Sequence, residues 1–170
     1  MPADALWYEA AQVVGITNAL NVAADGLGAA GLAAVSPESA APEVRVVFDE
    51  IRAFYGGATE VPAPFALIAH DPGYLADVWA AARHAYADNK LGRRLKAALA
   101  FAVSLTTRSA FGSAFHLAEM RRLGVTERGV LEVVGVTQMF SSYTKIADTL
   151  ALEPDMGDIA PADPSPAPGA

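Results

Sequence analysis

The sequence predicts an all-α fold of six or seven helices, and three observations support this. Alanine, the strongest helix former, is very abundant. Apolar residues recur at intervals of three and four along several stretches, as they do on one face of a helix. No stretch alternates apolar and polar residues in the manner of a half-buried strand. With 170 residues, of which 53% are hydrophobic and 18% charged, the chain is long enough to bury a core as one domain.

The first predicted helix covers residues 5–28. Its apolar residues have helical spacing, and Gly26 and Gly28 are expected to end it. Residues 29–42 are mostly small and include two prolines, so we interpret them as a linker.

The most regular amphipathic helix is predicted over residues 43–55. Pro62 and Pro64 then start a short helical turn. Asp71 followed by Pro72 is typical of a helix start, with a capping carboxylate and a proline in the first turn. The apolar stripe of the 43–55 helix contains Val44, Val47, Phe48, Ile51, Phe54 and Tyr55.

Three further helices follow. Residues 91–105 are nearly all apolar after a basic first turn, which predicts the central buried helix. Residues 109–123 form the next helix, which Gly124 closes. Thr126 caps the last one, which ends near Leu150. The helical domain is therefore expected over residues 43–152.

The remaining residues, 153–170, hold several prolines and few large apolar side chains. A segment of this composition cannot bury enough apolar surface to fold, so we predict a disordered tail.

One internal repeat is visible. Residues 13–17 read VVGIT and residues 133–137 read VVGVT, while ADGL at 24–27 is echoed by ADTL at 147–150. We interpret residues 1–28 as the remnant of a preceding repeat unit, equivalent to the last helix. The alternative is that two alanine-rich helices became similar by chance.

The composition excludes several classes of protein. A net charge of −7 argues against a nucleic-acid surface, and we interpret Lys90, Arg93, Arg94 and Lys96 as a solvated basic face. There is no cysteine, which excludes disulfides, thiolate metal sites and thiol redox chemistry. No run approaches the ~18 apolar residues that a membrane span needs, and no secretory signal is visible, so a soluble cytoplasmic protein is expected.

No cofactor or metal is predicted. No glycine-rich phosphate loop or dinucleotide fingerprint is present. His70 and His84 have no ligand spacing with each other or with a carboxylate.

The candidate site lies on the 109–123 helix. Ser109, Gly112, Ser113 and His116 share one side of it, and small polar residues around an imidazole are typical of a pocket. A glycine inside a helix costs ~1 kcal/mol relative to alanine, so close packing or room for a ligand should require Gly112. His116 is either a buried structural residue or a proton carrier that serves a small-molecule ligand.

Two residues could assist His116. Glu119 lies three positions later and could orient the imidazole, although Arg122 competes for its carboxylate. Tyr143, on the last helix, is a candidate hydrogen-bond partner.

Residues 44–150 resemble the carboxymuconolactone decarboxylase and alkylhydroperoxidase D-like family. The resembling segments are VFDEIRAFYGG, HDPGYLADVWAAARH, LGRRLKAALAFAVSL and FHLAEMRRLGVTERGVLEV. The resemblance implies a compact helical bundle and a homo-oligomer. The family's peroxidases carry C-x-x-C-x-x-x-H and a glutamate one helix earlier. These fall at Ser109, Gly112 and His116, and near Ala97, so only the histidine remains.

Two functions stay open. The first is a cofactor-free lyase or isomerase that acts on a small acid, with His116 transferring a proton. The second is a non-catalytic helical subunit for oligomer assembly or partner binding. Thiol peroxidase activity is not expected, because serine cannot form the thiolate that attacks peroxide. Trp7, Tyr8, Phe140 and Tyr143 exceed what one small core needs, which also favours an oligomer.

Overall fold

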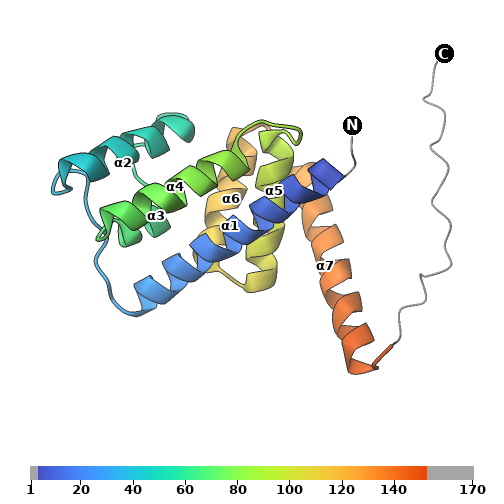
Figure 1. The fold of residues 1–170 in the computed structure, drawn as a ribbon. Helices are drawn as coiled ribbons and strands as arrows, with labels where there is room; N and C mark the ends of the chain where they lie inside the picture. The colour runs from blue at the N-terminus through green and yellow to red at the C-terminus, as the bar shows by residue number, and fades with distance from the viewer. Residues whose placement is uncertain (1–3, 153–170) are drawn as a thin grey trace, which may run out of the picture.

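The computed structural model describes residues 4–152, which form seven helices and no strand (Figure 1). The predicted all-α fold is confirmed. The predicted tail, residues 153–170, lies outside the described residues. The helices are α1 (Asp4–Ala29), α2 (Pro42–Phe54), α3 (Ala63–Ile68), α4 (Pro72–Tyr86), α5 (Arg93–Thr107), α6 (Ala110–Arg122) and α7 (Glu127–Thr149).

The first helix is longer than its glycines predict. α1 runs through Gly26 and Gly28, which therefore do not end it. It ends where Gly31 takes a left-handed conformation, with φ +73°, and the N–H of Leu32 donates to the carbonyl of Leu27 at 3.1 Å. A glycine tolerates helical backbone angles at a small cost, so the end of α1 depends on where the left-handed residue falls.

Three helix starts have side-chain caps, and the sequence indicates two of them, at Asp71 and Thr126. Asp71 accepts a hydrogen bond from the backbone N–H of Tyr74 at 3.0 Å, and Thr126 accepts one from Gly129 at 3.3 Å. Ser109 accepts one from Gly112 at 3.0 Å and so caps α6. Each cap satisfies a backbone donor that the first helical turn leaves free.

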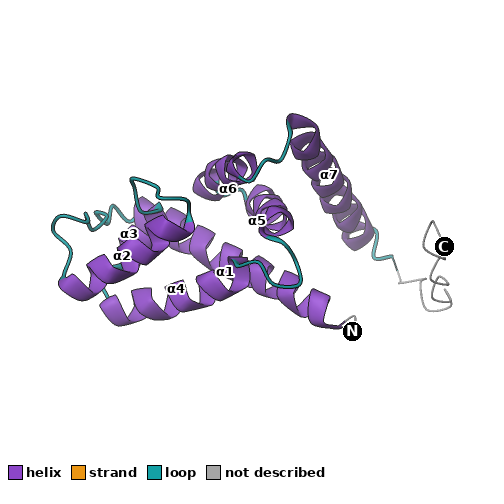
Figure 2. Cartoon of the chain, turned by 90° about the horizontal axis from the view of Figure 1, so that it is seen from above, coloured by secondary structure: helices purple, strands orange, loops and turns teal. Residues whose placement is uncertain are grey.

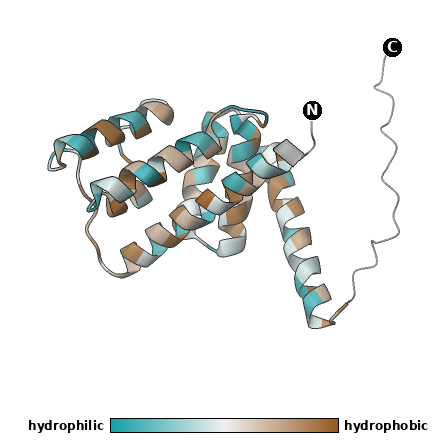
Figure 3. Cartoon of the chain, in the orientation of Figure 1, coloured by the Kyte–Doolittle hydropathy of each residue, from teal (hydrophilic) through white to brown (hydrophobic). Residues whose placement is uncertain are grey.

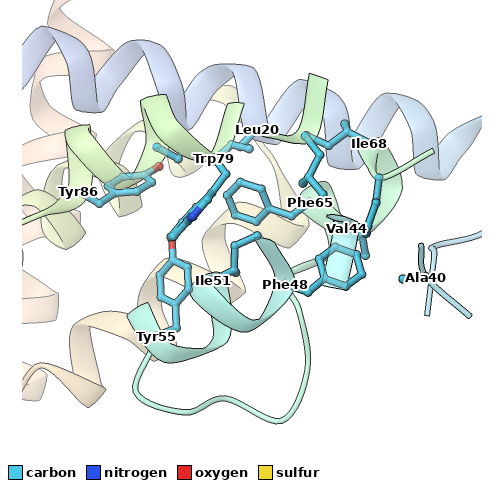
Figure 4. Packing of buried hydrophobic residues seen from close by; sticks show 14 of the residues in the cluster. Leu20, Ala40, Val44, Phe48, Ile51, Tyr55, Phe65, Ile68, Trp79 and Tyr86 are labelled. Carbon is cyan, nitrogen blue, oxygen red and sulfur yellow. The ribbon is translucent and has the colours of Figure 1, made fainter. Parts of the chain in front are cut away.

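The main core lies between α1, α2, α3 and α4. Val44, Phe48 and Ile51 of α2 are buried and face Phe65 and Trp79, as Figure 4 shows. The Trp79 ring meets the Phe65 ring edge to face, with 5.6 Å between centroids. The amphipathic stripe predicted on the second helix therefore packs inward as its spacing requires.

Helices α5 and α6 form an antiparallel hairpin behind this core. α5 contacts α1, α4, α6 and α7, which matches its predicted central place. Arg108, in a left-handed conformation with φ +59°, makes the tight connection to α6. Seen from above, the α5–α6 pair lies between α1 and α7 (Figure 2).

The last helix projects from the bundle. Its first turns pack on α5 through Val130, Val133 and Val134, and its C-terminal half extends away (Figures 1 and 2). None of its 23 residues is buried. Figure 3 shows hydrophobic residues along this exposed helix. None of the described helices combines the length and apolarity that crossing a membrane requires.

Candidate functional site

His116 is a buried residue at the centre of α6. Its side chain is surrounded by rings: the Tyr86 ring centroid lies 5.9 Å away and that of Phe115 lies 5.1 Å away. Only 4% of the residue is exposed. Burial lowers the pKa of His116 from 6.5 to about 4, because the charged imidazolium loses its hydration. The ring is therefore neutral at pH 7, a form that can accept a proton.

A small hollow of about 10 Å³ adjoins His116. This is room for about one water molecule, far less than the few hundred Å³ of a typical small-molecule pocket. Its polar lining is notable for so small a space. Besides His116, the polar residues around it are Tyr55, Tyr86, Arg93, Lys96 and Glu119.

Both tyrosines of this hollow are neutral phenols. Burial raises the pKa of Tyr55 and that of Tyr86, because a buried phenolate would lose its hydration. Tyr86 also shares a 2.8 Å hydrogen bond with the hydroxyl of Thr17 on α1. Sequence reasoning missed both tyrosines as site residues, since each also fits the apolar stripe of its helix.

Of the two possibilities for Glu119, orienting His116 or pairing with Arg122, the structure shows the pairing with Arg122. Its carboxylate forms ion pairs with Arg93, at 3.0 Å, and with Arg122, at 2.7 Å. Arg122 is the competitor that the helical spacing indicated, and its hydrogen bond with Glu119 raises its own pKa. The guanidinium of Arg93 also lies 3.9 Å from the centre of the Phe54 ring. Arg93 and Arg122 thus hold the carboxylate of Glu119.

The predicted solvated basic face is wrong for two of its four members. Lys96 is 0% exposed, and Arg93 is only partly exposed; Lys90 and Arg94 face solvent. The ammonium of Lys96 donates to the carbonyl of Ala87 at 2.7 Å and lies 3.3 Å from a carboxylate oxygen of Glu9. Glu9 belongs to α1, which packs on α5. This contact joins distant segments, so the spacing of basic residues along α5 does not predict it.

The small residues predicted to line a pocket do not line this hollow. Ser109 is buried as the cap of α6, and Ser113 is half-buried. Gly112 is needed for close packing, because a Cβ there would lie 2.5 Å from Ser104 Oγ and closer still to Asn21 Oδ1. Of the two explanations for this glycine, the structure shows helix packing.

Asn21 is the partner that brings α1 this close. Its amide nitrogen donates to the hydroxyls of Ser104, at 3.0 Å, and Thr107, at 3.2 Å, on α5. Its carbonyl oxygen is the single buried side-chain polar atom in the described residues that has no hydrogen-bond partner. The predicted repeat includes the helix that carries Asn21, but no pattern in the sequence indicates that Asn21 itself is important.

Tyr143 is not at the hollow where it was expected as a hydrogen-bond partner of His116. It is 59% exposed on α7 and does not line the hollow beside His116. Of the six predicted site residues, the structure brings His116 and Glu119 to one hollow and leaves the other four outside it.

The other two histidines are on the surface. The ring of His70 donates to the carbonyl of Ala33 at 2.8 Å, and His84 is exposed. In residues 4–152, no three His, Asp or Glu side chains are grouped so as to hold a metal ion.

Comparison with known proteins agrees with this architecture. The carboxymuconolactone decarboxylase family model matches residues 72–152. The crystal structure of the alkylhydroperoxidase AhpD core from Rhodospirillum rubrum superposes with a TM-score of 0.63, at 24% identity. The alignment covers 67% of this chain and 84% of that one. No curated protein matches. The chain therefore has the alkylhydroperoxidase D-like fold, and its residues 72–152 match the carboxymuconolactone decarboxylase family, in a sequence without cysteine.

Proposed function

We propose that this chain is a helical assembly subunit whose α7 packs against α7 of a second copy. The observation that carries the proposal is the exposure of α7, a 23-residue helix without one buried residue. A helix of this kind gains most of its stability by burying an apolar face, and within one copy the residues of α7 that pack on the core are the partly buried Val130, Val133 and Val134 of its first turns.

The exposed residues of α7 have the spacing of a coiled-coil seam. Five apolar residues, each more than half exposed, follow one another at alternating intervals of three and four. This 3-4 spacing keeps one apolar edge facing a partner helix over two heptads. The seam consists of Val136, Met139, Tyr143 and Ile146 of α7, together with Leu150, which caps the helix end.

A second copy suits this seam because the seam is apolar throughout. Two identical seams are complementary when related by a two-fold axis, so one surface supplies both sides of the interface. A groove of about 750 Å³ lies between the end of α5 and α7; Leu105, Val134 and Phe140 are its apolar lining residues, and its other lining residues are polar or charged. The exposed apolar seam with a partly polar groove beside it is typical of an interface rather than of a solvated helix.

Charged residues in the seam should separate the copies. We expect Tyr143→Glu/Ile146→Glu to convert an oligomer into a monomer, because pairing would bury the new carboxylates without partners. The measurement is mass by light scattering at micromolar concentration. Val46→Glu is the matched control, since Val46 is 60% exposed on α2, away from the seam, and should leave the mass unchanged. A monomeric unmodified protein would contradict the proposal.

A second candidate, proton transfer on a small acid by His116, is favoured by one observation. The neutral imidazole shares a hollow with Lys96 and two buried phenols, a grouping of titratable side chains that is common at functional sites. Because the hollow has room for about one water molecule, a substrate would require it to open.

Proton transfer at His116 can be tested without a known substrate. If this candidate is correct, the protein should accelerate deuterium exchange at the carbon next to the carbonyl of small keto acids in heavy water. We expect His116→Gln to remove at least 100-fold of that rate, the usual contribution of a general base. His84→Gln, on an exposed histidine, should leave it unchanged. Proton NMR reports the exchange, and equal rates in the first variant and the unmodified protein would contradict the role.

A thiol peroxidase reaction is outside both candidates. It needs a thiolate to attack the peroxide and a second thiol to resolve the product, and these 170 residues contain no cysteine.

A further inference from the structure

The carboxylate of Glu9 is held by three donors that belong to other parts of the chain. The backbone N–H of Lys90 donates to one of its oxygens at 3.0 Å, and the N–H of Leu91 donates to the other at 2.7 Å. The ammonium of Lys96 lies 3.3 Å from the second oxygen. The site is enclosed, since Glu9 is 9% exposed and Lys96 is fully buried.

The arrangement of the donors is that of an anion site. Two successive backbone N–H groups each meet a different carboxylate oxygen, which is how a backbone nest captures a carboxylate. A buried lysine supplies the compensating charge. The pKa of Glu9 is lowered, chiefly by the hydrogen bond from Leu91, so the group is held as an anion.

The donors and the acceptor come from separate elements. Lys90 and Leu91 lie in the loop between α4 and α5, and Lys96 lies in the first turns of α5. Glu9 comes from the N-terminal part of α1, and α1 connects to α2 through residues 30–41, none of them helical. The carbonyl of Ala87 also holds Lys96, so the lysine has a second anchor that does not depend on α1.

We propose that Lys96 and the backbone N–H groups of Lys90 and Leu91 form a binding site for a small organic carboxylate, and that α1 fills it with Glu9 as a built-in occupant. Lys96 also borders the hollow beside His116, whereas Glu9 does not line it. This inference requires neither the pairing of α7 nor proton transfer by His116.

The test removes the occupant and supplies the ligand. In Glu9→Ala the site loses its carboxylate, and acetate should bind there and raise the melting temperature by a few degrees at about ten times its Kd. Sodium chloride at equal ionic strength should not. The unmodified protein should not respond specifically to acetate, because Glu9 occupies the site. Glu9→Ala/Lys96→Met should lose the response, because the charge that holds the anion is gone.

Glu9→Gln keeps the side chain in place without its charge, so this variant should fold and show little response to acetate. If Glu9→Ala is unfolded alone, acetate should restore its helical circular dichroism. Failure of 100 mM acetate to do so, while Glu9→Gln folds, would overturn the proposal. An equal response to acetate and chloride, or the same response with and without Lys96, would also overturn it.

Discussion

Gly112→Ala is expected to destabilise the protein by ~3 kcal/mol or more, which lowers the melting temperature by about 10 °C. The added methyl group would overlap Asn21 Oδ1, lie 2.5 Å from Ser104 Oγ and lie 2.8 Å from Asn21 Cγ. All of these distances are shorter than real Cβ contacts. Neither neighbour can move freely, because the Asn21 amide is hydrogen-bonded to α5 and Ser104 Oγ to the carbonyl of Ala100.

The control for this clash lies on α7. Gly135 is also inside a helix but has no atom within 4 Å of an added Cβ. Gly135→Ala should therefore be neutral or stabilise by up to ~1 kcal/mol, the difference in helix propensity. Thermal unfolding of both variants makes the comparison, and a similar effect of the two substitutions would contradict the packing.

The partner in the clash can be identified by a double-mutant cycle. In an Asn21→Ala background, Gly112→Ala should cost less, because the nearest atoms are gone and Ser104 remains. Strictly additive losses would show that Asn21 is not the obstacle. The same overlap applies to a cysteine at position 112, whose Cβ lies in the same place. A cysteine at position 112 is therefore incompatible with the observed packing of α1 against α6.

Acid should weaken the fold through His116. The pKa of His116 is lowered to about 4, while in the unfolded chain it has its ordinary value of 6.5. Between pH 4 and pH 6.5 the unfolded chain binds the proton more tightly, so the free energy of unfolding rises with pH across this window. The difference between the two pKa values of His116 corresponds to about 3 kcal/mol in the free energy of unfolding. Below pH 4 both states are protonated, and this contribution is lost.

Chemical denaturation at pH 4.5 and at pH 6.5 measures this effect. We expect a clear loss of stability at the lower pH in the unmodified protein and a much smaller loss in His116→Gln. His84→Gln should keep the full dependence, since His84 is exposed. Lys96, Arg93 and Glu119 also line the hollow, and Glu9 faces Lys96. The lowered pKa of Glu9 stabilises the fold above pH 4.5, and most of this contribution is lost below 4.5, that is, below the two pH values that are compared. An unchanged dependence in His116→Gln would contradict the assignment.

The two copies of the predicted repeat share one structural feature, a threonine side-chain hydrogen bond. Thr17 in α1 and Thr137 in α7 donate to the carbonyl four residues earlier, at 2.6 and 2.7 Å respectively. Their surroundings differ, because Thr17 is buried against Tyr86 while Thr137 is only half-buried. The interpretation of α1 as a repeat remnant stays a prediction.

The sequence by itself determined the features that depend on neighbours along the chain. Helical spacing predicted the inward stripe of Val44, Phe48 and Ile51, and capping chemistry predicted the starts of α4 and α7 at Asp71 and Thr126. The absence of cysteine excluded thiol chemistry. These properties are local because a cap or an amphipathic face forms within a few residues of one segment.

Only the tertiary structure decided which chemistry surrounds His116. A basic residue at position 96 reads as solvated until α1 covers it with Glu9, and Gly112 reads as room for a ligand until Asn21 fills that room. Glu119 looks like a partner of His116 until Arg93, 26 residues away, takes its carboxylate. Burial and charge pairing arise from contacts between distant segments, and the spacing of residues along one helix does not contain them.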